Sequence, residues 1–116
     1  AYGWVYAGGW GFAPLAVDGP PAPPARLELS PAWPNPFSAS TVLRFALPRP
    51  GLVRVEVLDP QGRRLRRLFA GPLGAGPHDV TWDGRDEQGD AAATGIYWVR
   101  IETGSEAATR KVVRMR

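Results

Sequence analysis

The sequence predicts an all-β protein, a two-layer sandwich of seven antiparallel strands, and three observations lead to this fold class. Short segments in which apolar and polar residues alternate recur through residues 26–116. Turn residues separate them, since the 116-residue chain holds 14 glycines and 13 prolines. No Gly- and Pro-free window of a dozen residues shows a convincing helical period. The length fits one domain.

Seven segments fit strands that each turn one face toward a core. We expect them near Arg26–Ser30, at Thr41–Leu47, at Leu52–Leu58, near Arg63–Phe69, at Gly76–Trp82, at Gly95–Glu102 and at Ala107–Met115. The inward residues of the first six are expected to include Leu27, Leu29, Leu43, Phe45, Leu47, Val53, Val55, Val57, Val80, Trp82, Tyr97, Val99 and Ile101. In the seventh, alternation places Val113 and Met115 on one face and Arg110, Val112 and Arg114 on the other. Strict alternation is typical of antiparallel sheets, and seven such strands favour an immunoglobulin-like sandwich.

The connections agree with this fold. Asp59-Pro60-Gln61-Gly62 has Pro at the second position and Gly at the fourth, which predicts a type I turn with a bulge. The run 103–106, Thr-Gly-Ser-Glu, predicts a short hairpin loop, and Pro-rich residues 47–51 join two strands.

Composition divides the chain into three parts. Residues 1–17 are apolar, Gly-rich and uncharged, residues 18–25 form a stiff Pro-rich linker, and residues 26–116 form the sandwich. The uncharged stretch is broken by Gly and Pro and is too short for a membrane helix, so we expect no membrane span. The chain begins with Ala1, from which we expect a processed or fragmentary chain, and removal of a signal peptide is one route.

Residues 1–13 have a period of two. Even positions carry the aromatic residues Tyr2, Trp4, Tyr6, Trp10 and Phe12, with Gly8 as the only gap, and odd positions carry only small or aliphatic residues. We expect an extended strand whose aromatic face exposes about 1,000 Å² and needs a sheet to join. That sheet belongs to its own domain, to a domain lost upstream, or to a neighbouring copy; the Pro-rich spacer favours the neighbour. Head-to-tail donation then builds a homo-oligomeric filament.

Enzymatic chemistry finds little support. The chain has no Cys, and His78 is its only histidine, so it suits a strand edge better than a metal site. Asp83, Asp86, Glu87 and Asp90 cluster in one loop with Gly84 and Gly89, without the spacing of a known Ca²⁺ loop, which favours a long hairpin capped by Asp side chains. We therefore expect no catalytic residues, no metal and no cofactor.

A basic stripe is the second candidate site. It comprises Arg63, Arg64, Arg66 and Arg67, in a chain of net charge +3. An exposed strand face is the simpler interpretation; the functional one is contact with an anionic surface glycan, a lipid headgroup or the acidic loop 83–90. The aromatic residues lie in other segments, which disfavours binding of single-stranded nucleic acid.

An ordered set of motifs carries a family resemblance. It comprises Ser30-Pro31-Ala32-Trp33-Pro34-Asn35-Pro36-Phe37, residues 41–48 (TVLRFALP), residues 55–59 with Gln61-Gly62-Arg63, residues 76–78, residues 82–86 (WDGRD), Gly89, Gly95-Ile96-Tyr97 and residues 109–113. Over about residues 27–116 the chain resembles the Ig-like domain of flagellar hook-capping proteins and the C-terminal sorting domains of type IX secretion cargo. The resemblance implies an extracellular or cell-surface β-sandwich used for translocation through secretion machinery, surface attachment or assembly, without catalysis. A sorting domain of a larger secreted protein is thus the alternative to a filament subunit.

Overall fold

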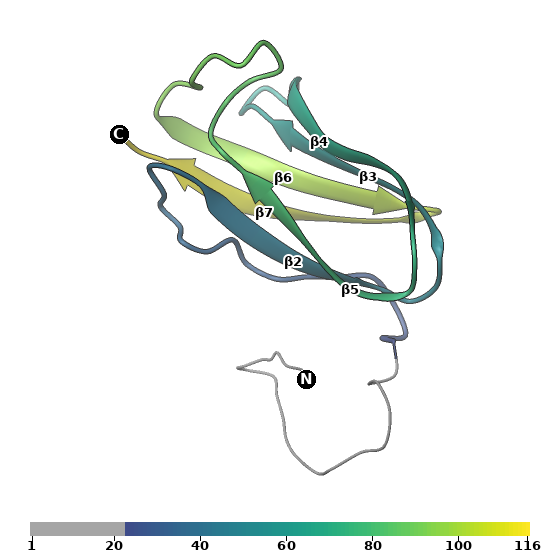
Figure 1. Cartoon of the computed structure of the whole chain (residues 1–116). Coiled ribbons are helices and arrows are strands. Elements are labelled where there is room, and N and C mark those ends of the chain that lie inside the picture. Colours follow the sequence, from purple (N-terminus) through teal and green to yellow (C-terminus); the bar gives the residue numbers. More distant parts are fainter. Residues whose placement is uncertain (1–22) are drawn as a thin grey trace.

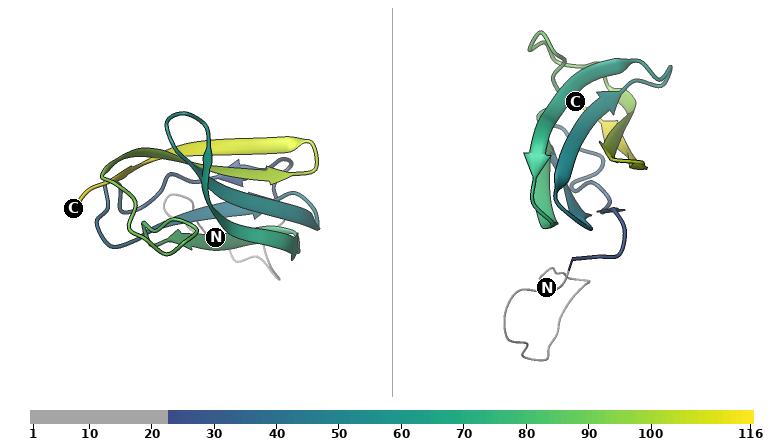
Figure 2. Two further views of the ribbon diagram at one scale, coloured as in Figure 1. Left: turned by 90° about the horizontal axis from the view of Figure 1, so that it is seen from above. Right: turned by 90° about the vertical axis from the view of Figure 1, so that its right-hand side faces the viewer.

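The computed structural model describes residues 23–116 and arranges them in two antiparallel sheets (Figures 1 and 2). The strands are β1 (Glu28–Leu29), β2 (Thr41–Leu47), β3 (Gly51–Leu58), β4 (Arg64–Leu73), β5 (Gly76–Trp82), β6 (Gly95–Thr103) and β7 (Glu106–Arg114). One sheet has the order β1-β2-β5 and the other β4-β3-β6-β7. The predicted seven-stranded antiparallel sandwich is confirmed. Within the described residues there is no helix of the length and apolarity that crossing a bilayer requires.

The core lies between the two sheets and follows from the alternation of the strands. In β3 the buried residues are Val53, Val55 and Val57, while Arg54 between them is exposed. The inward residues of β2 and β6 alternate in the same way, and together they form one apolar cluster. A strand that buries every second side chain can keep its other face in water, so the two sheets close on each other.

Trp82 lies at the centre of this core. Its ring meets Phe37 edge-on at 5.3 Å and Tyr97 at 5.2 Å between centroids. The indole N–H donates to Arg85 O at 2.9 Å, and the Tyr97 hydroxyl donates to Ala93 O at 2.7 Å. Burial raises the pKa of Tyr97, which keeps the phenol protonated as a donor. Both polar atoms of these large rings are thus satisfied, as buried Trp and Tyr require.

The two predicted turns form as the sequence indicated. Gly62 N–H donates to Asp59 O at 2.9 Å, and Gly62 has a φ of 84°, which suits the bulge after a type I turn. Thr103 pairs with Glu106 across a two-residue loop in which Gly104 has a φ of 56°. These turns fix the register of the β3–β4 and β6–β7 hairpins.

Two expectations about the strands are wrong. In β7 the inward residue is Val112, which is fully buried opposite Tyr97, whereas Met115 is 48% exposed beyond the strand end. β4 continues past the expected end at Phe69 to Leu73, with Pro72 inside it, because β4 is an edge strand and tolerates a missing N–H.

The loop after β5 also differs from the expected hairpin. It crosses from the three-stranded to the four-stranded sheet and holds only one bridge of its own, between Arg85 and Ala91.

The predictions for the first part of the chain lie outside the described residues. They concern the segment 1–17 and all but the last three residues of the linker 18–25. Pro23, Ala25 and Arg26 are exposed.

Candidate functional site

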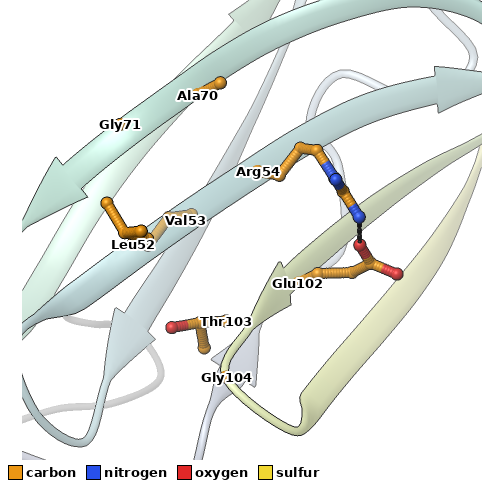
Figure 3. Close-up of a pocket in the computed structure, with 8 residues that line it drawn as sticks. All are labelled: Leu52, Val53, Arg54, Ala70, Gly71, Glu102, Thr103 and Gly104. Carbon is orange, nitrogen blue, oxygen red and sulfur yellow. Dashed lines mark hydrogen bonds and ion pairs between the residues drawn. The ribbon is translucent and has the colours of Figure 1, made fainter.

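A shallow hollow on the four-stranded sheet is the first surface to consider (Figure 3). It has a volume of about 320 Å³, and its lining includes the small residues Ala70, Gly71 and Gly104. Leu52, which is 73% exposed, stands at one side of it. On the other side, the Arg54 guanidinium reaches the Glu102 carboxylate, as the dashed line in Figure 3 marks.

The two charged groups of the hollow, Arg54 and Glu102, form an ion pair with each other. The hydrogen bond from Arg54 lowers the pKa of Glu102, and the same bond raises the pKa of Arg54. Glu102 also contacts Arg100 at 2.5 Å. A carboxylate held in its charged form by two guanidinium groups is a poor general acid or base near neutral pH. The hollow can therefore receive an apolar side chain beside Leu52, but its polar groups offer no acid–base pair.

The predicted basic stripe faces acidic residues of its own domain. Arg63 Nε lies 2.9 Å from Asp59 Oδ2, and Arg64 Nη1 lies 3.4 Å from Glu56 Oε2. Glu56 also lies 3.7 Å from Arg67 Nη2. Such exposed pairs are screened by water and contribute little to the stability of the fold. Their consequence here is electrostatic, because paired charges attract an external anionic surface less strongly.

Arg66 and Arg67 connect the stripe to the acidic loop. Arg66 Nη1 lies 2.5 Å from Asp83 Oδ1, and the backbone N–H of Arg67 donates to Glu87 Oε2 at 3.0 Å. The backbone N–H of Glu87 donates to Leu65 O at 3.2 Å. The structure thus joins the stripe to loop 83–90, which is one of the contacts that the sequence offered for the stripe.

The carboxylates of the loop hold its own backbone. Asp86 Oδ1 accepts from the N–H groups of Gln88 at 3.0 Å and Asp90 at 2.9 Å, and Asp83 Oδ1 accepts from Arg85 N–H at 3.1 Å. No group of three or more metal-ligating side chains occurs in residues 23–116.

His78 lies on β5, the edge strand of the three-stranded sheet. Its ring lies 5.5 Å from that of Phe45, and its Nε2 is 2.7 Å from Gly74 O. The imidazole ring is thus held by contacts within its own domain.

The proline-rich segment before β2 closes the edge of β7. The Asn35 amide donates to Lys111 O at 3.0 Å, and its oxygen accepts from Val113 N–H at 2.8 Å. Phe37 then continues the pairing, since its N–H donates to Val113 O and its carbonyl accepts from Met115 N–H. Asn35 thus replaces a strand residue at this edge. The sequence showed it only within a motif, and the one signal was an amide side chain set between two prolines.

Side chains of β7 close the edge of β1. Arg110 Nε donates to Leu29 O at 2.9 Å, and Glu106 Oε1 accepts from Leu27 N–H at 2.9 Å. The sequence gave no sign of either contact, because the partners lie about eighty positions apart.

The five aromatic residues predicted for the assembly interface, Tyr2, Trp4, Tyr6, Trp10 and Phe12, lie outside the described residues. No structural position is assigned to them.

Comparison with protein families identifies the domain family of this sandwich. Residues 37–107 match the model of the FlgD Ig-like domain. The chain belongs to the FlgD Ig-like domain family. The resemblance to the Ig-like domain of hook-capping proteins, drawn from the motifs, is confirmed, and with it the immunoglobulin-like class of the sandwich.

Relatives of known name are larger proteins. The basal-body rod modification protein FlgD of Salmonella typhimurium is 37% identical over 62 residues, which are 53% of this chain and 26% of that protein. The FlgD of Salmonella typhi matches to the same extent. The chain thus spans about a quarter of the length of the curated relatives it matches.

Two solved structures share the fold at 24% sequence identity. FlgD from Xanthomonas campestris gives a TM-score of 0.53 over 77% of this chain and 67% of that one. Dimeric latent PorU from Porphyromonas gingivalis gives 0.57 over 77% of this chain but only 9% of that one. At this identity the likeness concerns the fold alone.

Proposed function

We propose that this FlgD-type Ig-like domain is a non-enzymatic, extracellular assembly module, which joins copies of the chain by donating its N-terminal strand to a neighbour. The observation that carries the proposal is that the described sandwich has a continuous core made of its own strands. Trp82, Leu43 and Ile101 are fully buried and belong to one apolar cluster whose members all lie between Leu27 and Val112.

We therefore expect the aromatic side chains of residues 2–12 to be covered by a sheet edge, and not by the core of their own sandwich. An isolated strand carrying about 1,000 Å² of aromatic surface is unstable in water. That area matches the roughly 800 Å² per partner of a specific interface. A strand with a period of two meets such a need by adding to a sheet edge, where the backbone supplies affinity and alternate side chains supply specificity.

The relatives support an assembly role in general terms. FlgD of Salmonella typhimurium is a basal-body rod modification protein, and the Xanthomonas campestris structure is described as giving insight into hook capping essential for flagellar assembly. Donation from each copy to the next is head-to-tail, so it produces an open filament of identical subunits.

The test compares the full chain with two variants by sedimentation velocity and electron microscopy. One variant lacks residues 1–17, and the other keeps their composition in an order without the period of two. The full chain is expected to form large assemblies and both variants a folded monomer. Assembly by the deletion variant would contradict the proposal. Assembly by the reordered variant would show that apolar composition alone, and not a strand, drives association.

A second candidate is a C-terminal sorting or surface-attachment domain of a larger protein exported by type IX secretion machinery. It is favoured by the small share of longer chains that this fold occupies, 26% of FlgD and 9% of PorU. The length of the encoded precursor separates the candidates. A short precursor with a signal peptide ahead of Ala1 favours the filament, and a precursor several times longer favours sorting.

A further inference from the structure

The two sheets have four edges in total, and the described residues cover part of three of them. An open edge presents unpaired N–H and C=O groups to any passing strand, so covering it protects a stable monomer. The C-terminal part of β7 is covered by Asn35 and Phe37, and β1 is covered by side chains of Arg110 and Glu106. The first half of β4 is closed by Glu87 of the acidic loop. The rest of β4 contains Pro72 and follows a bulge in the β3–β4 ladder, and both features discourage pairing.

β5 is the edge that no segment of residues 23–116 covers, and the pairing of β2 shows which of its groups face outward. Trp33 and Val42 exchange both backbone hydrogen bonds at 2.9 Å, so Val42 faces the β1 side of its sheet. The backbone N–H and C=O groups of successive residues point to opposite sides of a strand. The backbone groups of Thr41 and Leu43, on either side of Val42, therefore point toward β5 and pair with it.

The same alternation applies to β5. Val80 and His78 pair with β2, and the residues between them turn their backbone groups away from it. The outward groups are the carbonyl of Pro77 and both backbone groups of Asp79 and Thr81. Pro77 therefore lies where its missing N–H leaves the ladder with β2 intact.

Beside this open edge runs a row of apolar side chains that the sandwich only half covers. β4 and β5 are joined by the turn at Gly74 and contact each other, so their edges border the same side of the molecule. Leu68 and Leu73 of β4 and Val80 of β5 pack on the core but remain partly exposed. A strand added to β5 that turned large apolar side chains inward would cover this row.

Residues 2–12 would fit such an edge as an extended strand, because the period of two in their sequence would then place all the aromatic side chains on one face. When the aromatic face turns inward, the small odd-numbered residues lie outside, on the same face as the side chains of Asp79 and Thr81. β5 has seven residues and is about 23 Å long, so the eleven residues from Tyr2 to Phe12 are long enough to follow its whole length.

The exit point of the chain favours a second copy as the source of the strand. The chain enters the sandwich at β1, and β1 and β5 are opposite edges of their sheet. Pro23, Ala25 and Arg26 are exposed, and Figures 1 and 2 show residues 23–27 leading away from the sheets. A stiff Pro-rich linker that leaves the sandwich at this point would present the aromatic segment to a neighbour.

We infer that the free edge of β5, with the half-covered row beside it, is the acceptor for residues 2–12 of a second copy. This inference rests on the proposed strand donation and adds to it the identity of the acceptor, the face that turns inward and the choice of β5 over the three partly covered edges.

Cysteine crosslinking tests the acceptor directly, since the chain has no cysteine of its own. Full-length Ala7→Cys protein, with the new thiol on the small face, is mixed with full-length Thr81→Cys protein and oxidised mildly. The matched control for the acceptor is Ala70→Cys, on exposed β4. The matched control for the donor is Gly8→Cys, which falls in the gap of the aromatic row and turns inward without removing an anchor.

The expected result is a mixed dimer of Ala7→Cys and Thr81→Cys that forms at least ten times faster than either control pair. Equal or faster linkage of Ala7→Cys to Ala70→Cys would overturn the assignment of β5 and leave strand donation intact. Equal linkage from Gly8→Cys would overturn the inward aromatic face. When both Ala7→Cys and Thr81→Cys are in one chain, a bond within that chain at high dilution would show self-packing and overturn the second copy. Assembly that survives deletion of residues 1–17 would instead remove the proposed function itself.

Discussion

Replacing Asn35 by Ala removes the side chain that closes the end of β7. The loss consists of the hydrogen bonds to Lys111 O at 3.0 Å and from Val113 N–H at 2.8 Å. Each bond is worth about 1 kcal/mol net, and both lie at the surface, where water replaces part of the loss. We expect the free energy of unfolding to fall by about 1 to 2 kcal/mol. For a sandwich of this size that lowers Tm by about 4 to 8 °C per kcal/mol.

The variant Asn35→Asp distinguishes the contributions of the two hydrogen bonds, because it keeps one and loses the other. Its carboxylate still accepts from Val113 N–H, but it sets a charged oxygen against the Lys111 carbonyl, where the amide donates. At neutral pH this variant is expected to be at least as unstable as Asn35→Ala. Below pH about 4 the protonated carboxyl regains a donor, so its deficit relative to wild type at the same pH should shrink. Exposed Ser38 provides a control substitution, Ser38→Ala, with no expected effect.

The assay is urea unfolding followed by far-ultraviolet circular dichroism, with each variant compared with wild type at pH 7 and pH 3. An Asn35→Ala variant within about 0.3 kcal/mol of wild type would refute the role of the amide as a replacement strand residue. An Asn35→Asp deficit that does not change with pH would refute the assigned donor geometry.

Two further predictions concern the loops. Gly84→Ala and Gly62→Ala both force an L side chain into a positive φ, of 77° and 84°, at a cost of about 1 to 2 kcal/mol. Only at Gly84 would the new Cβ also lie 2.5 Å from Arg114 Nε, so Gly84→Ala should lose about 1 kcal/mol more in urea unfolding, and equal losses would contradict the contact. The backbone N–H of Arg63, with its guanidinium, lowers the pKa of Asp59. A lowered folded pKa stabilises the fold above the unfolded value of about 3.9, and this stabilisation is lost as the pH falls through the folded pKa. Asp59→Asn should therefore destabilise the protein at pH 7 and flatten the fall in stability below pH about 4; parallel acid curves for the two proteins would contradict this assignment.

The sequence predicts the strands best where one strand's pattern is enough. β2 and β5 have the expected bounds, because apolar and polar residues alternate clearly in both, Pro48 directly follows β2, and β5 begins at Gly76. β7 shows where this fails. The adjacent Val112 and Val113 fit either face, and the choice depends on the cross-strand register that sets Val112 opposite Tyr97. Local alternation contains no information about that partner.

The candidate surfaces are less predictable because their contacts join distant parts of the chain. Asn35 and Lys111 are 76 positions apart, and Arg110 and Leu29 are 81 apart. The sequence did name the arginine stripe and the acidic loop, and it named their mutual contact as one option. It did not indicate that Glu87 closes the edge of β4, because an edge exists only once the order of strands in the sheets is known.

The difference between the four edges is what connects the fold to assembly. Closing an edge takes a dedicated contact: an amide between two prolines at β7, a guanidinium at β1, a loop carboxylate at β4. In a sandwich that covers part of its other edges in this way, an open β5 beside half-covered apolar side chains carries the aggregation risk of any exposed edge. If residues 2–12 of a second copy add to β5 as we propose, one contact would pair the open edge and cover the aromatic side chains at the same time. The two features would then each be unfavourable alone and favourable together.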